Sequence, residues 1–437
     1  MIDGVEQRDT LAALLHAHWG LRVTSLRAMA TGHTNKTYWA WDGVRSVVLR
    51  VSWAGKPERQ VRDEASVLAW LGTPRNTALE PGCPTALPEM PAVPRLVPTS
   101  DGQACLRWNA HWLHVFEAIP GRAGEFGEAR MDDSGPSVSI SRRAGNSRAL
   151  SGKADDPRGM TAINTPQTEA LSGTVTSPSD GFPPHDRPAC GGPERHVPLR
   201  THDDHGPPGP SANADPDVPT ASIANAMRTL ARLHGALAAL ATDTQDALAW
   251  LRARHTRVSR LPNAAIPSIP EHQYGSVLPS IAGLLSSLDA GIPGPVQWLH
   301  GDYHAGNLLL IDQDVSGILD FDDVGQGSPW IEAAFALFAL TRDVSREDAF
   351  VFDAPAWDAG LRAYAQIRPD VPAAWLQAHR GRLMLLFCAD QVLIHLHAAR
   401  RGLWAPGAGM GFLGCWRQLL AARQPGLPHQ LPETGLG

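Results

Sequence analysis

Lysine is nearly absent from this 437-residue sequence, in which Lys36, Lys56 and Lys153 are the only examples among 38 lysines and arginines. Arginine therefore carries almost all of the positive charge, a bias that we attribute to genome composition rather than to function. The formal net charge of −6 argues against a general nucleic-acid binder, which would carry an excess of basic residues. We expect no nucleic-acid partner.

Cysteine and long apolar runs are also scarce. The five cysteines are odd in number and form no C-x-x-C pair, which is typical of unpaired thiols in a reducing compartment: Cys83, Cys105, Cys190, Cys388 and Cys415. The longest apolar run, residues 333–340, is too short to span a bilayer, and the acidic, polar start MIDGVEQRDT is no signal peptide. We expect a soluble, cytoplasmic protein without a membrane partner; the oligomeric state stays open.

One long segment lacks hydrophobic periodicity. Residues 122–219 are dense in Gly, Pro, Ser, Asp and Arg, and such a composition buries too little apolar surface to offset the entropy of ordering. We interpret it as a low-complexity, disordered insertion between an N-terminal lobe, residues 1–121, and a C-terminal lobe, residues 220–437. The whole sequence is 43% hydrophobic, so the chain outside this segment can form a sizeable core.

The stretch WLHGDYHAGNLLLIDQDVSGILDFDDVGQGS, residues 298–328, carries the strongest pattern. It predicts a loop, a strand, a turn, a second strand and a second loop. The hairpin would bring Asn307 and Asp320 to neighbouring strand ends, with Asp302 close by. Acidic and amide oxygens beside a polar loop suit Mg²⁺, a hard cation that takes further ligands from phosphates.

These residues resemble a known family. H-G-D-x-x-x-x-N followed by I-L-D-F-D-D is similar to the catalytic and metal loops of the aminoglycoside phosphotransferase and choline kinase family, whose fold is protein-kinase-like. The resemblance implies that Asp302 is the catalytic base and that Asn307 and Asp320 hold Mg²⁺. Asp322 is either a metal neighbour or a hydrogen-bond acceptor. His300 and its neighbour His304 are interpreted as structural, because no third zinc ligand follows at a usual spacing.

The N-terminal lobe shows further elements of the same family. A helix is predicted over residues 9–19, and two strands around a glycine-containing turn over residues 31–41, where G-x-x-N-x-T-Y resembles the nucleotide loop and makes Gly32 and Asn35 candidate phosphate contacts. Arg50, in the predicted strand 47–51, stands where the family usually has a phosphate-binding lysine. Glu64 lies on the buried stripe of a predicted helix over residues 56–71 and needs a cationic partner, for which Arg50 is the obvious candidate.

The remaining pattern predicts a hinge and several helices. Residues 104–108 and 111–119 are typical of a hairpin, after which the resemblance implies an inter-lobe hinge that meets adenine near Glu117 and Ile119. Helices are predicted over residues 221–237, 246–257, 276–288, 330–340, 355–366 and 372–401. The resemblance suggests that the last ones wall the acceptor site, with Asp343, Asp390 and Trp404 as candidate contacts.

The sequence thus predicts an α+β, two-lobed, protein-kinase-like fold: an antiparallel sheet lobe with one packed helix, and a mostly helical C-terminal lobe. The implied activity is ATP- and Mg²⁺-dependent transfer of the γ-phosphoryl group to a hydroxyl of a small molecule, such as an aminoglycoside, homoserine, a choline-like alcohol or a sugar. The alternatives are a serine/threonine protein kinase of the bacterial stress-response type and an inactive nucleotide-binding regulatory module. GTP instead of ATP also stays open.

Overall fold

The computed structural model describes residues 5–29, 35–73, 90–123, 218–261, 276–288, 291–312, 314–343, 349–400 and 410–422. Nearly all of the predicted insertion, residues 122–219, lies outside the described residues, as does Gly32. The boundaries of the two predicted lobes therefore stay a prediction, and the elements below are given as the structure has them.

The N-terminal part contains a five-stranded antiparallel sheet in the order β1-β2-β3-β5-β4. Its strands are β1 (Ser25–Ala28), β2 (Lys36–Trp41), β3 (Ser46–Val51), β4 (Leu106–Trp108) and β5 (His111–Glu117). Alternate residues of a strand point to opposite faces, and β3 shows this well. Its Val47 and Leu49 are fully buried on one face, whereas Val48 and Arg50 point to the other. The first strand lies earlier than the predicted strand pair within residues 31–41.

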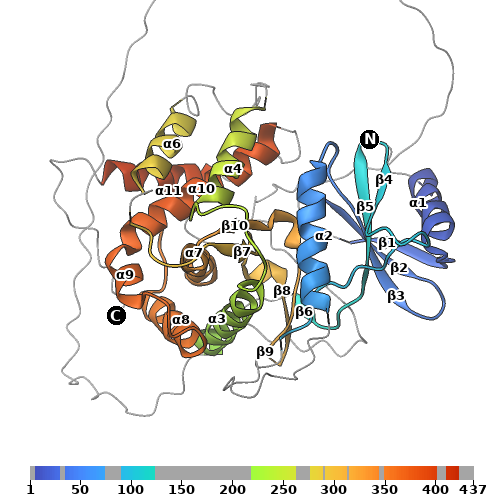
Figure 1. The fold of residues 1–437 in the computed structure, drawn as a ribbon, viewed down its shortest axis with the longest axis horizontal. Coiled ribbons are helices and arrows are strands. Elements are labelled where there is room, and N and C mark those ends of the chain that lie inside the picture. The colour runs from blue at the N-terminus through green and yellow to red at the C-terminus, as the bar shows by residue number, and fades with distance from the viewer. Residues whose placement is uncertain are drawn as a thin grey trace, which may run out of the picture. The chain divides into compact units, whose positions relative to one another are not determined.

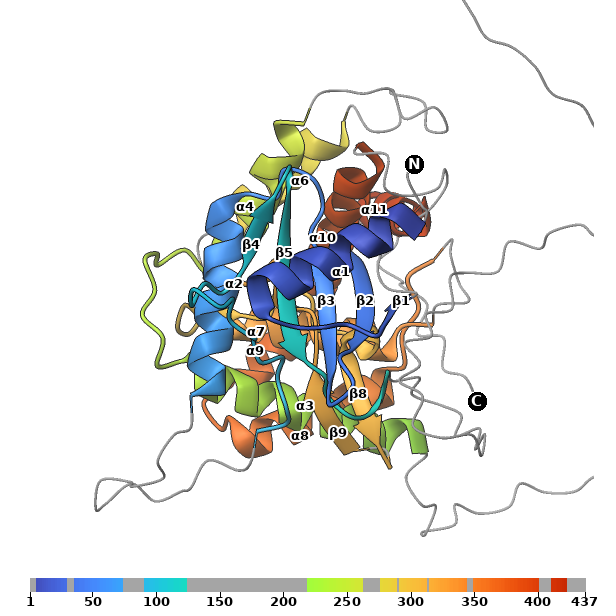
Figure 2. The same cartoon turned by 90° about the vertical axis from the view of Figure 1, so that its right-hand side faces the viewer.

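One helix covers each face of this sheet, as Figures 1 and 2 show. Helix α1 (Val5–Trp19), which begins earlier than predicted, buries Leu11 and Leu15 in the same cluster as Val47 and Leu49. Helix α2 (Glu58–Gly72) lies on the other face, between the strands and the C-terminal elements in Figure 1. Its Val67 and Leu68 join the large C-terminal core. The side of the sheet that carries Arg50 is therefore the side facing the C-terminal part.

The chain passes into the second part through residues 118–121, where the hinge was predicted. Strand β6 (Arg122–Ala123) pairs with β8 (Leu308–Ile311), which forms a hairpin with β9 (Asp314–Ile318). Gly121 has a φ of +137°, and a Cβ there would lie 2.7 Å from Ser316 Oγ and 2.9 Å from Leu309 Cβ. Only glycine fits this crossing without a shift of its neighbours.

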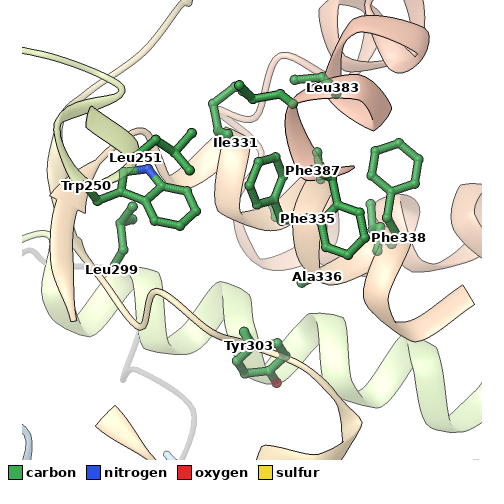
Figure 3. Packing of buried hydrophobic residues seen from close by; sticks show 14 of the residues in the cluster. Trp250, Leu251, Leu299, Tyr303, Ile331, Phe335, Ala336, Phe338, Leu383 and Phe387 are labelled. Carbon is green, nitrogen blue, oxygen red and sulfur yellow. The ribbon is translucent and has the colours of Figure 1, made fainter. Parts of the chain in front are cut away.

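Helices dominate the C-terminal part. They are α3 (Val218–Leu237), α4 (Ala249–Ser259), α6 (Val277–Ser287), α7 (Pro329–Thr341), α8 (Ala354–Ile367), α9 (Ala373–Ala378), α10 (Arg380–Arg400) and α11 (Met410–Ala421); two short strands, β7 (Gln297–Leu299) and β10 (Gly325–Gly327), pair antiparallel. Helix α7 is buried nearly all round. Its Phe335 and Phe338 pack against Phe387 of α10 with ring centroids 5.4 and 5.9 Å apart, and Figure 3 shows this aromatic contact.

The predicted α+β, kinase-like architecture is confirmed, with two corrections in the last helices. Residues 372–401 form two helices rather than one, because the chain leaves helical geometry at His379 (φ −104°, ψ 7°). There the His379 N–H donates to Trp375 O and ends the first helix. Helix α11 was not predicted. By length and composition α10 could cross a membrane, yet 67% of its most apolar window is buried inside the protein. Core helices of soluble proteins pass the same test.

Candidate active site

The β8–β9 hairpin places the two predicted metal ligands side by side. Leu308 lies opposite Ile318, and the Leu319 N–H donates to Asn307 O over 2.7 Å, so Asn307 and Asp320 flank the same open end of the hairpin. Asp320 adopts the left-handed conformation (φ 60°, ψ 65°), which costs a non-glycine residue of order 1–3 kcal/mol and persists at functional sites.

Asp302 is fixed by its neighbours in the catalytic loop. The Asn307 side-chain amide donates to Asp302 O over 2.8 Å and to Asp302 Oδ2 over 3.3 Å, and His304 Nε2 lies 3.3 Å from the same Oδ2. Burial alone would raise the pKa of Asp302, but His304 and then Arg254 lower it, and the net pKa is well below its ordinary value. Asp302 is therefore an ionised acceptor next to a histidine that the sequence reading had classed as structural.

His300 and Gly301 shape the loop that presents Asp302. The buried His300 ring places Nε2 2.8 Å from Leu319 O and accepts the Asp302 N–H at Nδ1, so it joins the catalytic loop to the end of β9. Gly301 has a φ of +84°, and a Cβ there would lie 1.9 Å from Asp323 O. The glycine of H-G-D is thus a steric requirement of the close approach between the two loops.

Glu332 of α7 binds the backbone of the same loop. Its carboxylate accepts the His300 N–H over 3.2 Å and the Gly301 N–H, and it lies 2.8 Å from Nε2 of His234. His234 places Nδ1 2.7 Å from the Tyr364 hydroxyl. Glu332 stands where the resembling family usually has an aspartate, so the longer side chain still reaches the loop. His234 is buried and uses both ring nitrogens in these contacts.

The predicted pair of Arg50 and Glu64 is present. Arg50 Nη2 donates to Glu64 Oε1 inside the interface between β3 and α2, and both side chains are buried. Arg50 Nη1 lies 3.4 Å from Asp320 Oδ1, so the guanidinium reaches from the N-terminal sheet to the metal loop. Its Nε has no hydrogen-bond partner among the described residues.

Lys56 belongs to this network, whereas the sequence makes it a phosphate candidate only if Arg50 and Glu64 do not meet. Its side chain is fully buried; Nζ lies 3.0 Å from Glu64 Oε2 and also contacts Asp322 Oδ1. Lys56 had been assigned to the start of a helix because Pro57 follows it, and such a lysine is usually exposed. The signal that could have found it is its rarity in an arginine-rich chain.

Asp322 accepts hydrogen bonds, which is one of the two roles left open for it. Its carboxylate accepts a hydrogen bond from Lys56 Nζ. Its backbone oxygen accepts one from Gln60 Nε2 over 2.7 Å. Low-dielectric surroundings and the Asp322 carboxylate raise the pKa of Asp320 to about 6, although the Asp320 side chain keeps 38% exposure. Asp320 is therefore a partly exposed carboxylate whose ionised form an added cation would stabilise.

A second buried cation lies on the other side of the catalytic loop. Arg254 of α4 is 4% exposed, pairs with Asp390 of α10, lies 3.4 Å from Asp323 Oδ1 and donates to Gly301 O over 3.3 Å. Asp390 was a candidate acceptor contact. Because it is 2% exposed and bound to Arg254, it cannot meet an acceptor in this arrangement.

The remaining predicted contacts to the nucleotide and to the acceptor differ in burial and hydrogen bonding. Asn35 is buried and its Oδ1 has no hydrogen-bond partner among the described residues, which fits a side chain that awaits a ligand. The Glu117 N–H already donates to Arg95 O over 2.9 Å, so this N–H is not available to adenine. Ile119 lies in the hinge and is half-buried. The remaining two acceptor candidates are Asp343, which is exposed, and Trp404, which lies outside the described residues.

The described residues contain no group of three or more His, Cys, Asp or Glu side chains that could hold a metal ion by themselves. The donors at the hairpin still fit a magnesium ion that shares phosphate oxygens. Asp320 offers a carboxylate, and Asn307, whose amide N–H is directed to Asp302, keeps its side-chain oxygen for a cation. Both donors are oxygens, as a hard cation requires.

A five-stranded sheet with a helix on each face, joined through residues 118–121 to a helical lobe that carries these two loops, is the protein-kinase-like fold. Residues 191–375 match the model of the phosphotransferase enzyme family (APH), a match that covers fewer than half of the residues. The resemblance predicted from the catalytic and metal loops is thereby confirmed, and so is a phosphotransferase as the class of enzyme.

One solved structure supports the same fold. This structure, "Amicoumacin kinase hAmiN in complex with AMP-PNP, Ca2+ and Ami", aligns over 98% of this chain and 98% of its own, with 12% identity and a TM-score of 0.55. Two others align less well. A microcompartment-associated aminopropanol kinase shares 14% identity over 95% of this chain and 98% of its own, with a TM-score of 0.48. Macrolide 2'-phosphotransferase MphH from Brachybacterium faecium shares 16% identity over 91% of this chain and 96% of its own, with a TM-score of 0.45. No curated protein matches the sequence.

Proposed function

We propose that this protein transfers the γ-phosphoryl group of Mg²⁺–ATP to a hydroxyl group of a small molecule in the cytoplasm. The observation that supports this most is the position of Asp302. Its ionised carboxylate is held by Asn307 and His304 at the edge of the site, while the partly exposed Asp320 carboxylate faces Arg50. A proton acceptor and a charge-binding centre are the two parts that phosphoryl transfer needs.

Each residue has a role in this proposal. Asp302 accepts the hydrogen bond of the acceptor hydroxyl, orients it and takes its proton. Asn307 and Asp320 would hold the magnesium ion, which supplies positive charge beside the phosphate oxygens when it is bound. Arg50 adds the forked donor geometry that suits phosphate. Asn35 and the backbone near Gly32 would contact the phosphates from the nucleotide loop.

The adenine would lie at the hinge. There Ile119 supplies apolar contact, and the Glu117 carbonyl is the part of Glu117 considered for hydrogen bonding, since its N–H is already used. Aminoglycosides, homoserine, choline-like alcohols and sugars are the proposed acceptor classes. The similar amicoumacin kinase structure holds AMP-PNP and Ca²⁺, which supports a nucleotide and a divalent cation at the corresponding place without identifying the acceptor.

A panel of these acceptors tests the proposal. Release of ADP from Mg²⁺–ATP, and of GDP from Mg²⁺–GTP as the donor control, is measured in the presence and absence of each acceptor. We expect acceptor-dependent release that stops when Mg²⁺ is chelated. Nucleotide binding by calorimetry with no turnover on any acceptor would favour the inactive regulatory module, and phosphorylation of a protein serine or threonine would favour the protein kinase. Absence of both binding and turnover would contradict the proposal.

A further inference from the structure

Lys56 is a lysine with two carboxylates and no access to solvent. Its side chain is 0% exposed, Nζ lies 3.0 Å from Glu64 Oε2 of α2, and it also contacts Asp322 Oδ1 of the metal loop. Burial alone would lower the pKa of Lys56, but Asp322 and Glu64 raise it to a net value above the ordinary one. The ammonium is therefore charged and binds the two carboxylates to each other across the interface.

Arg50 lies against the same carboxylates, and its side chain keeps 8% exposure, whereas that of Lys56 keeps none. Its Nη2 reaches Glu64 Oε1, and its Nη1 points to the partly exposed Asp320 carboxylate over 3.4 Å. The Arg50 Nε is without a partner among the described residues, and the guanidinium carbon stacks 5.0 Å from the Phe116 ring centroid. Arg50 thus occupies the boundary between the buried network and the open side of the site, whereas Lys56 lies wholly inside.

We infer that Lys56 is a positioning residue and that the two cations divide one task. Lys56 shares the neutralisation of Glu64 and Asp322 with Arg50, which leaves Arg50 Nη1, beside the partly exposed Asp320, to bind the nucleotide phosphates. This inference rests on the proposed phosphotransferase function. It accounts for an arginine in the strand position where the resembling family has lysine, because the lysine that pairs with the helix carboxylate is supplied by the loop between β3 and α2.

Charge balance explains why both cations are needed. Three carboxylates, those of Glu64, Asp320 and Asp322, lie against two cations. Without Lys56, Arg50 would face all three carboxylates alone, and the electrostatic attraction would hold it on Glu64 and Asp322. The site would then present an excess of negative charge to a polyphosphate, which weakens binding. A direct phosphate contact by Lys56 does not fit its complete burial.

The experiment measures Mg²⁺–ATP affinity by calorimetry on four folded forms of the full chain: the unchanged protein, Lys56→Met, Asp322→Asn and the double variant. Lys56→Met should raise Kd by about 10-fold or more, the scale of interactions inside one ion-pair network. In the double variant one of the two carboxylates that Lys56 neutralises has lost its charge, so loss of Lys56 should raise Kd less than in the unchanged protein, and Kd should stay close to that of Asp322→Asn. That non-additivity would not arise if Lys56 only filled space or bound phosphate directly.

The matched control is Arg59→Met. Arg59 is an exposed cation of helix α2 that pairs with Asp243 at 3.0 Å and with Asp63 at 3.7 Å, so its loss removes the same charge without entering the site. Its Kd should stay within about twofold, as the small energies of exposed ion pairs imply. Arg50→Met should lose the most affinity of all, since it removes the proposed phosphate ligand.

The outcomes separate two failures. A chain that binds Mg²⁺–ATP, but in which Lys56→Met behaves like Arg59→Met or adds fully to Asp322→Asn, overturns the role of Lys56 and leaves the proposed function standing. An unchanged protein that binds no Mg²⁺–ATP overturns the proposed function itself. If Lys56→Met does not fold, the comparison of the double variant with Asp322→Asn decides alone, because removing a buried pair as a whole is tolerated better than removing one partner.

Discussion

Two charged networks flank the catalytic and metal loops, and they join different parts of the chain. The first contains Lys56, Arg50 and Glu64 of the N-terminal part together with Asp320 and Asp322 of the metal loop. The second, around Arg254, lies wholly within the C-terminal part. The first therefore depends on the approach of the two parts, and the second does not.

The difference teaches how the site separates its tasks. The Arg254 network contains Asp390 and Asp323 and ends on the Gly301 carbonyl, next to Asp302. We expect changes there to act on the orientation of the acceptor hydroxyl and on the stability of the C-terminal part. Changes in the network around Arg50 should act on the nucleotide. Each prediction below would strengthen or remove that contrast.

The largest effect is expected at Asp302. Asp302→Asn keeps the shape of the side chain and removes the proton acceptor, and general-base catalysis typically contributes roughly 10²–10⁴-fold. The kcat for a verified acceptor should fall by that factor while the KM for Mg²⁺–ATP stays within a few-fold. Steady-state kinetics on the purified variant measure both. An unchanged kcat would remove Asp302 from the mechanism.

The buried pair of Arg254 and Asp390 should dominate stability. Either Arg254→Met or Asp390→Leu removes one partner of a buried ion pair, which typically costs about 3–5 kcal/mol, whereas the double variant should recover most of that loss. Urea unfolding of the three variants gives the free energies. The double variant still lacks the donor to Gly301 O, so its kcat should remain reduced; full activity would show that Arg254 has no influence on the loop.

Arg50 and Glu64 should be energetically linked through the nucleotide. Arg50→Ala and Glu64→Ala should each raise the KM for Mg²⁺–ATP, and the double variant should not be additively worse, because residues in one ion-pair network show interaction energies of about 0.5–3 kcal/mol. A double-mutant cycle on kcat/KM measures the link. Strict additivity would mean that the contact seen between them does not matter to nucleotide use.

His114 offers a smaller, pH-dependent effect. It lies opposite Arg50 in the sheet. Burial lowers the pKa of His114, Glu64 raises it, and the charges of Arg50 and Lys56 lower it further, so that the net pKa is about 3. The folded protein therefore keeps His114 neutral while the unfolded chain is protonated below the ordinary pKa of about 6.5. The unfolded state binds more protons between these values, so stability is present above pH 6.5 and falls as pH decreases toward 3.

The size of this effect is up to about 1.4 kcal/mol per pH unit for one proton. His114→Leu should remove that contribution and give a shallower loss of unfolding free energy between pH 6.5 and pH 5. Urea unfolding of both proteins at the two pH values tests it, with the difference between the proteins cancelling the other titrating groups. Parallel pH dependences would show that His114 does not stay neutral.

Sequence patterns predicted the parts of this site that depend on local periodicity. The alternation in β3 and the helical stripe of α2 brought Arg50 to Glu64, and the two apolar runs of the hairpin brought Asn307 to Asp320. In both cases the side chain's direction follows from a period of two or of 3.6 residues. The fold class follows from the same patterns together with the resemblance.

The remaining parts depend on tertiary contacts that no local pattern encodes. Lys56 lies in a loop, so no periodicity tells whether it points to water or, as here, to Asp322, which is 266 residues away. The burial of Asp390 likewise depends on Arg254 of another helix, 136 residues away. A buried charge needs a partner, but the sequence alone does not say which distant residue supplies it.

The central claim is that Asp302 serves the acceptor while Asp320 serves the nucleotide. Calorimetry of Mg²⁺–ATP binding to Asp302→Asn and Asp320→Asn, side by side with the unchanged protein, tests it most directly. Asp320→Asn should lose Mg²⁺-dependent nucleotide affinity, because a charged oxygen ligand is removed beside the phosphates. Asp302→Asn should bind nearly as well as the unchanged protein. If Asp302→Asn lost nucleotide binding and Asp320→Asn kept it, the two roles would be reversed and the account would be contradicted.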